Sequence, residues 1–289
     1  MEVQRDIEAM REAARALRRQ RGSLAFVPTM GNLHDGHMAL VAEAQRRAPA
    51  VAVSIFVNPM QFNDARDFAA YPRTLTEDIA LLEAQDVDLL FAPAAEEFYR
   101  RPLEQSARVV VPGLSEILCG AHRPGHFTGV ATVVNKLFNI VRPSVALFGE
   151  KDFQQLLLIR RMVEELALEV EIVAVPTVRE RDGLAMSSRN RYLDEEERRR
   201  APALYRTLCE AAEAVASGRR DYAALEAQGM ARLERAGFRP EYFAIRRAAD
   251  LEPPAEAESG ALRVLAAAWL GRARLIDNIA VPMPPSENR

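Results

Sequence analysis

Five short segments are continuously apolar, and they constrain the fold more than any other feature of the chain. They are residues 24–28 (LAFVP), 50–58 (AVAVSIFVN), 87–93 (VDLLFAP), 144–150 (SVALFGE) and 170–176 (VEIVAVP). Runs of this length, rich in Val, Ile, Leu and Phe, are typical of strands that are buried on both faces. Segments of helical period lie between them, and such alternation predicts a parallel sheet covered by helices.

The pattern changes after Pro176. Two charged stretches of helical period, about 194–217 and 221–236, precede three strand-like segments, which are 241–248 (EYFAIRRA), 263–270 (RVLAAAWL) and 273–281 (ARLIDNIAV). A Gly-Arg turn separates the last two segments, which favours antiparallel pairing. We therefore expect a Rossmann-like α/β domain over residues 1–176, followed by a smaller α+β domain with an antiparallel sheet over residues 177–289.

Composition excludes several classes of protein. The 289 residues are 49% hydrophobic and carry a net charge of -3, so nothing in the overall balance attracts nucleic acid or anionic lipid. The first twenty residues lack the apolar centre of a signal peptide, and no apolar run reaches the length of a membrane span. Cys119 and Cys209 lie far apart, which argues against a disulfide framework. We expect a cytoplasmic protein whose partners are small molecules or further copies of itself.

Lysine is nearly absent from the chain. Lys136 and Lys151 are the two lysines among 38 basic residues, and the others are arginine. The general preference for arginine carries no functional information. A lysine in such a chain is more informative, because it provides a compact ammonium group where a planar guanidinium does not fit. Lys136, on a predicted helix, has no assigned role, whereas Lys151 directly follows a predicted strand.

The stretch PTMGNLHDGH (28–37) follows the first predicted strand and contains two of the four histidines. Ligands of open parallel sheets bind at the carboxyl ends of the strands, where turns present backbone N–H groups to anions. Gly31 and Gly36 allow close backbone approach, and His34 and His37 could donate hydrogen bonds to a phosphate. The alternative is an ordinary turn, which needs glycine and polar residues in any case.

A zinc site is a second alternative for the histidines. His34 and His37 could share one face, and CGAHRPGH (119–126) adds Cys119, His122 and His126 at plausible ligand spacing. Neither group has the paired ligands of a structural zinc site, and Arg123 would repel a cation. We therefore do not predict a metal held by protein side chains alone.

Three further polar stretches follow predicted strands. Each has an ordinary explanation as a turn, a cap or a surface loop. Together they would gather phosphate donors and a polar pocket at one edge of the sheet, because the carboxyl ends of parallel strands converge. The stretches are VNPMQF (57–62) with Asn58 and Gln61, FGEKDFQQ (148–155) with Gly149, Lys151, Asp152 and Gln155, and DGLAMSSRN (182–190) with a Gly183 hinge, Ser187, Ser188 and Arg189.

The order of these motifs resembles that of pantothenate synthetases, which belong to the nucleotidylyl transferases. The resemblance spans nearly the whole chain. The motifs that carry it are PTMGNLHDGH, SIFVNPMQF, YPRTL, RPGHFTGV, FGEKDFQQ and DGLAMSSRNRYL.

The resemblance implies ATP-dependent ligation of (R)-pantoate and β-alanine through an enzyme-bound pantoyl adenylate, with release of AMP and pyrophosphate. It implies Mg²⁺ held mainly by the ATP phosphates, a homodimer formed through the first domain, and a second domain that acts as a lid. The residues that it assigns to ATP are Met30, Gly31, Asn32, Leu33, His34, Asp35, Gly36, His37, Gly149, Glu150, Lys151, Asp152, Val178, Met186, Ser187, Ser188 and Arg189.

Among the residues that the resemblance assigns to ATP, those expected to act in catalysis are His34, His37, Lys151, Ser187, Ser188 and Arg189. Those expected to bind substrate are Gln61 (pantoate and β-alanine), Gln155 (pantoate), Asn58, Arg123 and His126. Two other classes remain open. A different nucleotidylyl transferase would share the histidine turn but lack the two glutamines, and a non-catalytic nucleotide sensor would not need Lys151 and the histidines beside a leaving pyrophosphate.

Overall fold

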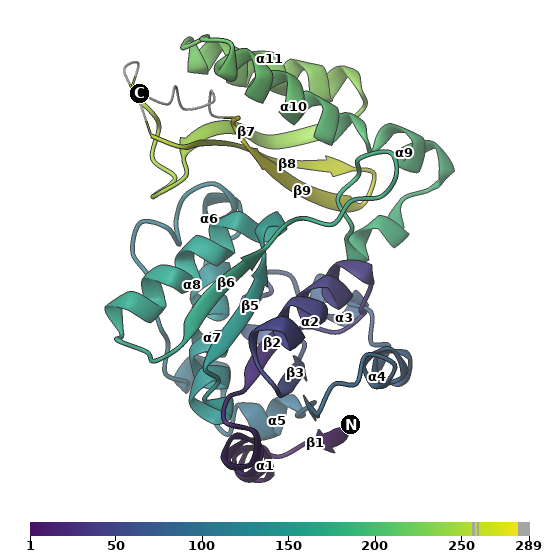
Figure 1. Ribbon diagram of the computed structural model, residues 1–289. Coiled ribbons are helices and arrows are strands. Elements are labelled where there is room, and N and C mark those ends of the chain that lie inside the picture. Colours follow the sequence, from purple (N-terminus) through teal and green to yellow (C-terminus); the bar gives the residue numbers. More distant parts are fainter. Residues whose placement is uncertain (256–257, 259, 283–289) are drawn as a thin grey trace. The chain divides into compact units, whose positions relative to one another are not determined.

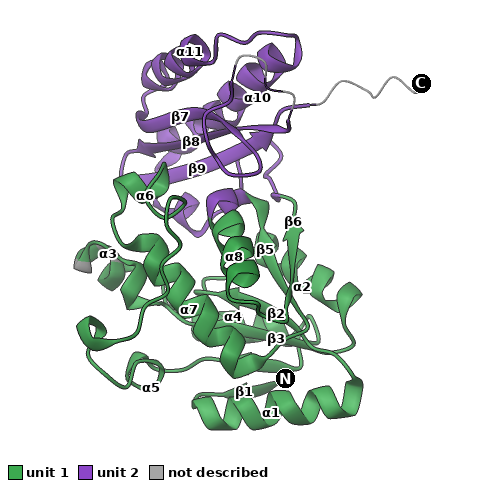
Figure 2. Ribbon diagram, turned by 90° about the vertical axis from the view of Figure 1, so that its left-hand side faces the viewer, with its two compact units in different colours: residues 1–150, 155–176 green, residues 151–154, 177–289 purple. Residues whose placement is uncertain are grey.

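The computed structural model describes residues 1–255, 258 and 260–282. The chain forms two compact units, which Figure 2 shows in different colours. Unit 1 consists of residues 1–150 and 155–176, and unit 2 begins at residue 177 and also includes the short segment 151–154. The chain thus passes into unit 2 once at Lys151, returns at Gln155, and passes into it again after Pro176.

Unit 1 contains a six-stranded parallel sheet, which confirms the predicted α/β class. Its strands lie in the order β1-β4-β3-β2-β5-β6. Five of them come from the five apolar segments: β2 (Ala25–Thr29), β3 (Val51–Ile55), β4 (Leu89–Phe91), β5 (Val145–Gly149) and β6 (Glu171–Val175). The sixth, β1 (Glu2–Gln4), was not predicted; it lies at the sheet edge and pairs in parallel with β4.

Helices pack against both faces of this sheet (Figure 1). On one face, Leu40 and Ala44 of α2 lie in the same apolar core as Val27 and Val53 of the strands. On the other face, Phe138 of α7 meets a strand phenylalanine edge to face, with ring centroids 6.4 Å apart. The helices of this part of the chain are α1 (Ile7–Arg21), α2 (Asp35–Arg47), α3 (Ala65–Ala70), α4 (Leu75–Glu83), α5 (Ala95–Phe98), α6 (Cys119–His122), α7 (His126–Val141) and α8 (Phe153–Glu165), with 3₁₀ turns η1 (Pro59–Gln61), η2 (Leu103–Gln105) and η3 (Glu150–Asp152).

The direction of chain progression reverses between β2 and β5. From β2 the chain continues to β3 and β4 on one side, and it then returns to form β5 and β6 on the other. Such a switch point is where open α/β sheets bind ligands, beyond the carboxyl ends of the strands. The predicted histidine turn follows β2, Gln61 follows β3, and Gly149 is the last residue of β5, so the topology brings these segments to the same sheet edge.

Unit 2 is built on a three-stranded antiparallel sheet, as predicted. Its strands β7 (Arg239–Arg247), β8 (Leu262–Leu270) and β9 (Ala273–Ala280) lie in sequence order. Helices α10 (Ala203–Ala216) and α11 (Tyr222–Arg235) cover one face and share its apolar core. The predicted helical stretch 194–217 is divided into α9 (Glu195–Arg200) and α10, because Pro202 has no backbone N–H to continue the helical ladder. A 3₁₀ turn η4 (Ser188–Tyr192) precedes α9.

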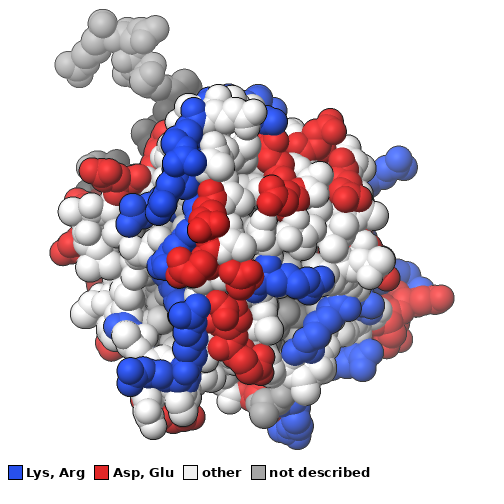
Figure 3. All heavy atoms as spheres, turned by 90° about the horizontal axis from the view of Figure 1, so that it is seen from below, with Lys and Arg blue, Asp and Glu red and all other residues white. Residues whose placement is uncertain are grey.

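Charge is mixed on the face of the molecule shown in Figure 3. Basic and acidic side chains are interspersed there without one large basic area. This arrangement agrees with the net charge of -3. Among the described residues, the helices are all too short or too polar to cross a membrane.

Candidate functional site

The turn after β2 is held by a buried carboxylate that the sequence analysis did not identify. Asp78 of α4 is 2% exposed and accepts hydrogen bonds from the backbone N–H groups of Asn32 (2.9 Å) and Leu33 (2.7 Å). The Gly31 N–H donates to Thr29 Oγ1 at 3.1 Å, and Asn32 has a φ of 53°. Asp78 thus fixes a strained turn directly before the two histidines. A signal was present, because Asp78 shares a buried helical face with Leu82, where an apolar residue is expected.

Asp78→Asn should loosen this turn. The isosteric amide keeps one acceptor oxygen but places an NH₂ donor against a backbone N–H donor. Loss of a buried hydrogen bond with an unsatisfied donor costs about 1–3 kcal/mol of unfolding free energy. Denaturant unfolding measures this loss, and exposed Glu77 on the same helix provides the control, Glu77→Gln, which should stay within about 0.5 kcal/mol. Equal stability of the two variants would contradict the role given to Asp78.

The two histidines cap the first turn of α2. His34 is the N-cap residue, and its Nδ1 accepts from the Gly36 N–H at 3.1 Å, while His37 Nδ1 accepts from the His34 N–H at 3.3 Å. The ring centroids lie 4.2 Å apart. Because Nδ1 of each ring is an acceptor, the proton of each neutral ring is on Nε2. Both rings are therefore held in the tautomer that can donate from Nε2, at a helix N-terminus that favours anions.

Gln61 ends the turn η1 that follows β3, and it is 7% exposed. Its side-chain Nε2 lies 3.1 Å from the Met30 sulfur, which joins this segment to the histidine turn. Asn58 is 1% exposed and donates to Gln61 Oε1 at 3.0 Å and to the Gly129 carbonyl at 3.1 Å. The Tyr99 hydroxyl donates to Asn58 Oδ1 at 2.8 Å, and burial raises the pKa of Tyr99, so the phenol stays protonated. Asn58 therefore orients Gln61.

Helix α7 approaches η1 so closely that only glycine fits at the contact. A Cβ at Gly129 would lie 2.5 Å from the Met60 carbonyl oxygen. The helix begins at His126, whose Nδ1 lies 2.9 Å from the Gln61 carbonyl oxygen, and Arg123 Nη1 lies 3.1 Å from His126 Nε2. Since a carbonyl only accepts and arginine only donates, His126 donates from Nδ1 and accepts at Nε2. Arg123 and His126 thus support the backbone of Gln61.

The zinc alternative gains no support from this arrangement. Both ring nitrogens of His126 already face protein partners. His122 is exposed and is the last residue of α6, before the loop that leads to His126. In the part of the chain that the structure describes, three or more His, Cys, Asp or Glu side chains do not come together as metal ligands.

The residues predicted for the site around the end of β5 are divided between the two units. Gly149 and Glu150 belong to unit 1, Lys151 and Asp152 belong to unit 2, and half-buried Gln155 returns to unit 1 in the first turn of α8. The Lys151 side chain is 18% exposed, and its Nζ lies 3.7 Å from Asp152 Oδ2. Lys151 and Ser187 line one small cavity of unit 2.

The predicted loop 182–190 comprises the second part of a hairpin, formed by residues 178–186, and the start of η4. Met186 N–H donates to the Val178 carbonyl at 3.0 Å, and Ser187 Oγ accepts from the Arg189 N–H at 3.2 Å. Arg198 pairs with Asp182 at 2.6 Å and holds the pKa of that carboxyl below its usual value. Gly183, which the sequence analysis took as a hinge, is a packed turn residue with a φ of 93°, and a Cβ there would lie 2.4 Å from the Tyr205 ring.

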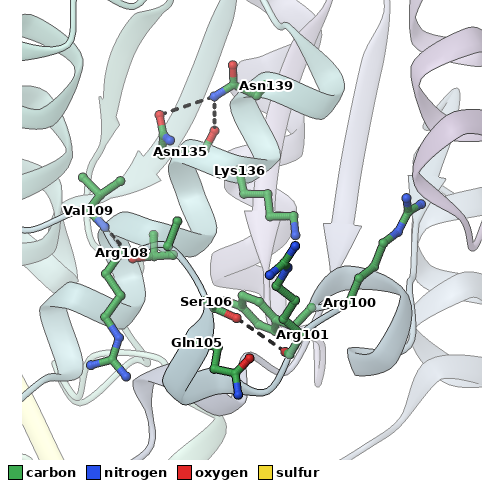
Figure 4. A pocket seen from close by; sticks show the side chains of 12 residues that line it. Arg100, Arg101, Gln105, Ser106, Arg108, Val109, Asn135, Lys136 and Asn139 are labelled. Atoms are coloured by element: carbon green, nitrogen blue, oxygen red, sulfur yellow. Dashed lines mark hydrogen bonds between the residues drawn. The ribbon is translucent and has the colours of Figure 1, made fainter.

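The second lysine lies in a different place. Lys136 of α7 donates to the Phe98 carbonyl, and its ammonium lies 4.8 Å from the Phe98 ring centroid. It lines a pocket of about 570 Å³ between α7 and residues 99–109, together with Arg100, Arg101 and Arg108 (Figure 4). The predicted site residues do not line this pocket. Lys136 was left without a role in the sequence analysis, and Lys151 is the lysine that follows β5.

Comparison with known proteins identifies the family of the chain. The model of the pantoate-beta-alanine ligase family matches residues 2–280. The pantothenate synthetase of Nitrosococcus oceani is 54% identical over 283 residues, which cover 98% of this chain and 99% of the relative. That of Aliivibrio fischeri is 52% identical over 288 residues, covering 100% of this chain and 99% of the relative.

Solved structures of the same family match nearly the whole chain. The pantothenate synthetase of Thermus thermophilus has a TM-score of 0.90 at 47% identity, with 98% of this chain and 100% of that chain covered. The pantoate-beta-alanine ligase of Francisella tularensis, solved in complex with beta-gamma ATP and beta-alanine, has a TM-score of 0.82 at 33% identity, with 99% and 100% covered. The chain described here belongs to the pantoate-beta-alanine ligase family of enzymes.

Proposed function

We propose that this enzyme joins (R)-pantoate to β-alanine to form pantothenate, with ATP as the activating substrate. A carboxylate does not condense with an amine directly in water, so it must first be activated. A pantoate carboxylate oxygen attacks the α-phosphorus of ATP, and the bond to the bridging oxygen breaks as pyrophosphate leaves with the electron pair. The β-alanine amine then attacks the carbonyl carbon of the enzyme-bound pantoyl adenylate, loses a proton, and AMP leaves.

The observation that carries this proposal is the fixed tautomer of His34 and His37. Hydrogen bonds at Nδ1 leave the proton of each neutral ring on Nε2, beside a helix N-terminus at the sheet switch point. Negative charge grows on the phosphate oxygens during adenylation, and donors that are already oriented stabilise it without reorganisation. Met30, Gly31, Asn32, Leu33, Asp35 and Gly36 supply the backbone around these donors.

Lys151, Ser187, Ser188 and Arg189 are proposed to serve the phosphates as well. Among the described residues the Arg189 guanidinium makes no ion pair, and the Lys151 ammonium has a 3.7 Å contact with Asp152 and a longer-range attraction to Asp277. Cations in this state favour an anionic ligand, because a new pair replaces water instead of a protein partner. By family resemblance, Gly149, Glu150, Asp152, Val178 and Met186 complete the nucleotide site.

Gln61 and Gln155 are proposed to bind the organic substrates. A neutral amide can donate to a carboxylate and accept from a hydroxyl or an ammonium group, so it suits both pantoate and β-alanine. Gln61 is supported for this role by Asn58, which donates to its side chain, and by Arg123 and His126, which both contact its backbone carbonyl oxygen. These three residues are therefore proposed to act through Gln61.

Mg²⁺ is proposed to arrive with ATP. It keeps several waters and binds phosphate oxygens with few protein carboxylates, which fits the described residues, where Asp152 is a half-exposed carboxylate beside Lys151. When bound, it would neutralise phosphate charge. By family resemblance we also propose that the enzyme is cytoplasmic and forms a homodimer through unit 1. Sedimentation velocity would test the dimeric state.

The proposed reaction is tested by AMP release from ATP. Release should require both pantoate and β-alanine for continuous turnover, and pantothenate should accumulate in equal amount. AMP release that responds to another acid instead of pantoate would indicate a different nucleotidylyl transferase. Binding of ATP without any turnover would indicate a nucleotide sensor.

Unit 2 is proposed to act as a lid through its hairpin. Because the hairpin is tied by Arg198 and packed at Gly183, we expect it to move as one piece and not to unfold. Amide hydrogen exchange in residues 180–190 should slow when ATP and Mg²⁺ are added, whereas exchange in α11, which carries no site residue, should not change. Unchanged exchange in the hairpin would contradict the lid role.

A further inference from the structure

Two adjacent residues of β9, Asp277 and Asn278, contact two segments of unit 2 that contain predicted phosphate-binding residues. Asp277 contacts the hairpin that leads to Ser187, and Asn278 contacts the segment that contains Lys151. Asp277 and Asn278 are 3% and 5% exposed, so they are two adjacent buried polar residues in a strand that also contains Arg274. Successive side chains of a strand point to opposite faces of the sheet. Asp277 therefore lies on the same face as Leu275, which is covered by α10, and Asn278 lies on the other face.

Asp277 holds the hairpin through Arg179. The Arg179 guanidinium donates to both carboxylate oxygens, at 2.6 and 3.0 Å, and stacks 3.9 Å from the Tyr205 ring centroid. Burial raises the pKa of Asp277, and the guanidinium opposes that shift. A paired carboxylate with a bidentate partner fixes both position and orientation.

Arg179 transmits this position along the hairpin. Its Nη1 also donates to the Gly183 carbonyl at 3.1 Å, and its backbone bridges to Ala185 on the opposite hairpin strand. That strand continues directly into Ser187, the N-cap of η4. The ion pair therefore anchors the hairpin just before the Ser187–Arg189 turn.

Asn278 holds the segment that contains Lys151. Its Nδ2 donates to the Lys151 carbonyl at 2.9 Å, and its Oδ1 accepts from Arg263 at 2.5 Å. Arg263 stacks 3.8 Å from the ring centroid of Phe153, two residues beyond Lys151. One amide side chain thus connects the Lys151 backbone to a buried arginine of the sheet.

We propose that Asp277 and Asn278 are positioning residues, which hold the Ser187–Arg189 turn and Lys151 in fixed relation for adenylation. This inference rests on the proposed function. Both anchors come from neighbouring positions of one strand, so a displacement of β9 would move both groups. A shift of about 1 Å in a catalytic group can reduce a rate by about a hundredfold.

The test uses two substitutions at Asn278. Asn278→Asp keeps the acceptor for Arg263 but turns a carboxylate oxygen toward the Lys151 carbonyl, and Asn278→Ala removes both contacts without adding charge. Glu241→Gln is the control, because it breaks a largely buried ion pair with Arg274 of the same sheet, and this ion pair includes no residue of either segment. Asp277→Asn tests the hairpin anchor in the same way.

The measured quantities are ATP–pyrophosphate exchange with pantoate, and conversion of supplied pantoyl adenylate by β-alanine. Both Asn278 variants should slow exchange about 10- to 100-fold while conversion falls less than about threefold, and Glu241→Gln should change neither. In a Lys151→Arg background, Asn278→Ala should reduce the exchange rate little further, because the effects of substitutions at residues that act through one another are not additive.

Equal losses in the two half-reactions, full additivity with Lys151→Arg, or slow exchange in Asn278→Asp alone would overturn the inference. The first would indicate general destabilisation, and the last an effect of the added charge. Failure of the proposed function is distinguishable, since the unmodified enzyme would then show no pantoate-dependent exchange.

Discussion

His37→Ala is expected to slow ATP–pyrophosphate exchange by about two to three orders of magnitude. The ring is held at Nδ1 by the His34 N–H, and the substitution removes a donor to the phosphate charge that develops in the transition state. The exchange is measured with labelled pyrophosphate, Mg²⁺ and pantoate. The same variant should convert supplied pantoyl adenylate far better than it uses ATP and pantoate, because His37 is not required to activate the amine.

The capping role of His37 needs its own control. His37 occupies the third helical position of α2, where Glu or Gln usually completes a capping box. His37→Gln should therefore restore the stability lost in His37→Ala but not the exchange rate. Full recovery of exchange by glutamine would mean that the cap, and not the ring donor, supports catalysis. Equal losses in both half-reactions would show that His37 also works in amide formation.

Lys151→Arg is expected to reduce turnover by about ten- to a thousandfold, although the charge is kept. The Lys151 side chain is largely buried, and the residue lies in η3, two positions after the end of β5. A planar guanidinium cannot take the place of a compact ammonium group there. Steady-state turnover of the purified, folded variant measures the loss.

The chain contains one matched control for this substitution. Lys136→Arg changes the other lysine, which lines the pocket of Figure 4 and has no proposed role in the reaction. Its ammonium lies against the rings of Phe98 and Tyr99. Its turnover should stay close to that of the unmodified enzyme. Near-normal activity of Lys151→Arg, or an equal loss in both variants, would contradict a specific role for Lys151.

Most of the fold follows from local sequence patterns. The five predicted strands are continuously apolar because helices cover both faces of the sheet, so each strand carries its own signal. Strand β1 has only three residues, lies at the edge and is partly exposed, so it has no such signal. The division of the 194–217 stretch depended on Pro202, a recognised helix breaker that a long charged pattern concealed.

The candidate site was less predictable, because its support comes from residues distant in sequence. Asp78 holds the histidine turn from a helix more than 40 residues away, and Asn278 contacts Lys151 across 127 residues. Such contacts leave only an indirect sign in the sequence. The sign is a polar residue at a position where the hydrophobic periodicity of the helix or strand predicts an apolar one. Asn58 and His126 were predicted as substrate contacts from their motifs, and their hydrogen bonds to Gln61 were not visible there.

The central claim is that an adenylate forms before the amine takes part, and isotope exchange tests it most directly. The enzyme is given ATP, Mg²⁺, labelled pyrophosphate and pantoate, without β-alanine. We expect label to enter ATP at a rate comparable to turnover, and to stop entering when pantoate is withheld. Exchange that strictly requires β-alanine would contradict the account, because it would mean a concerted reaction with no pantoyl adenylate.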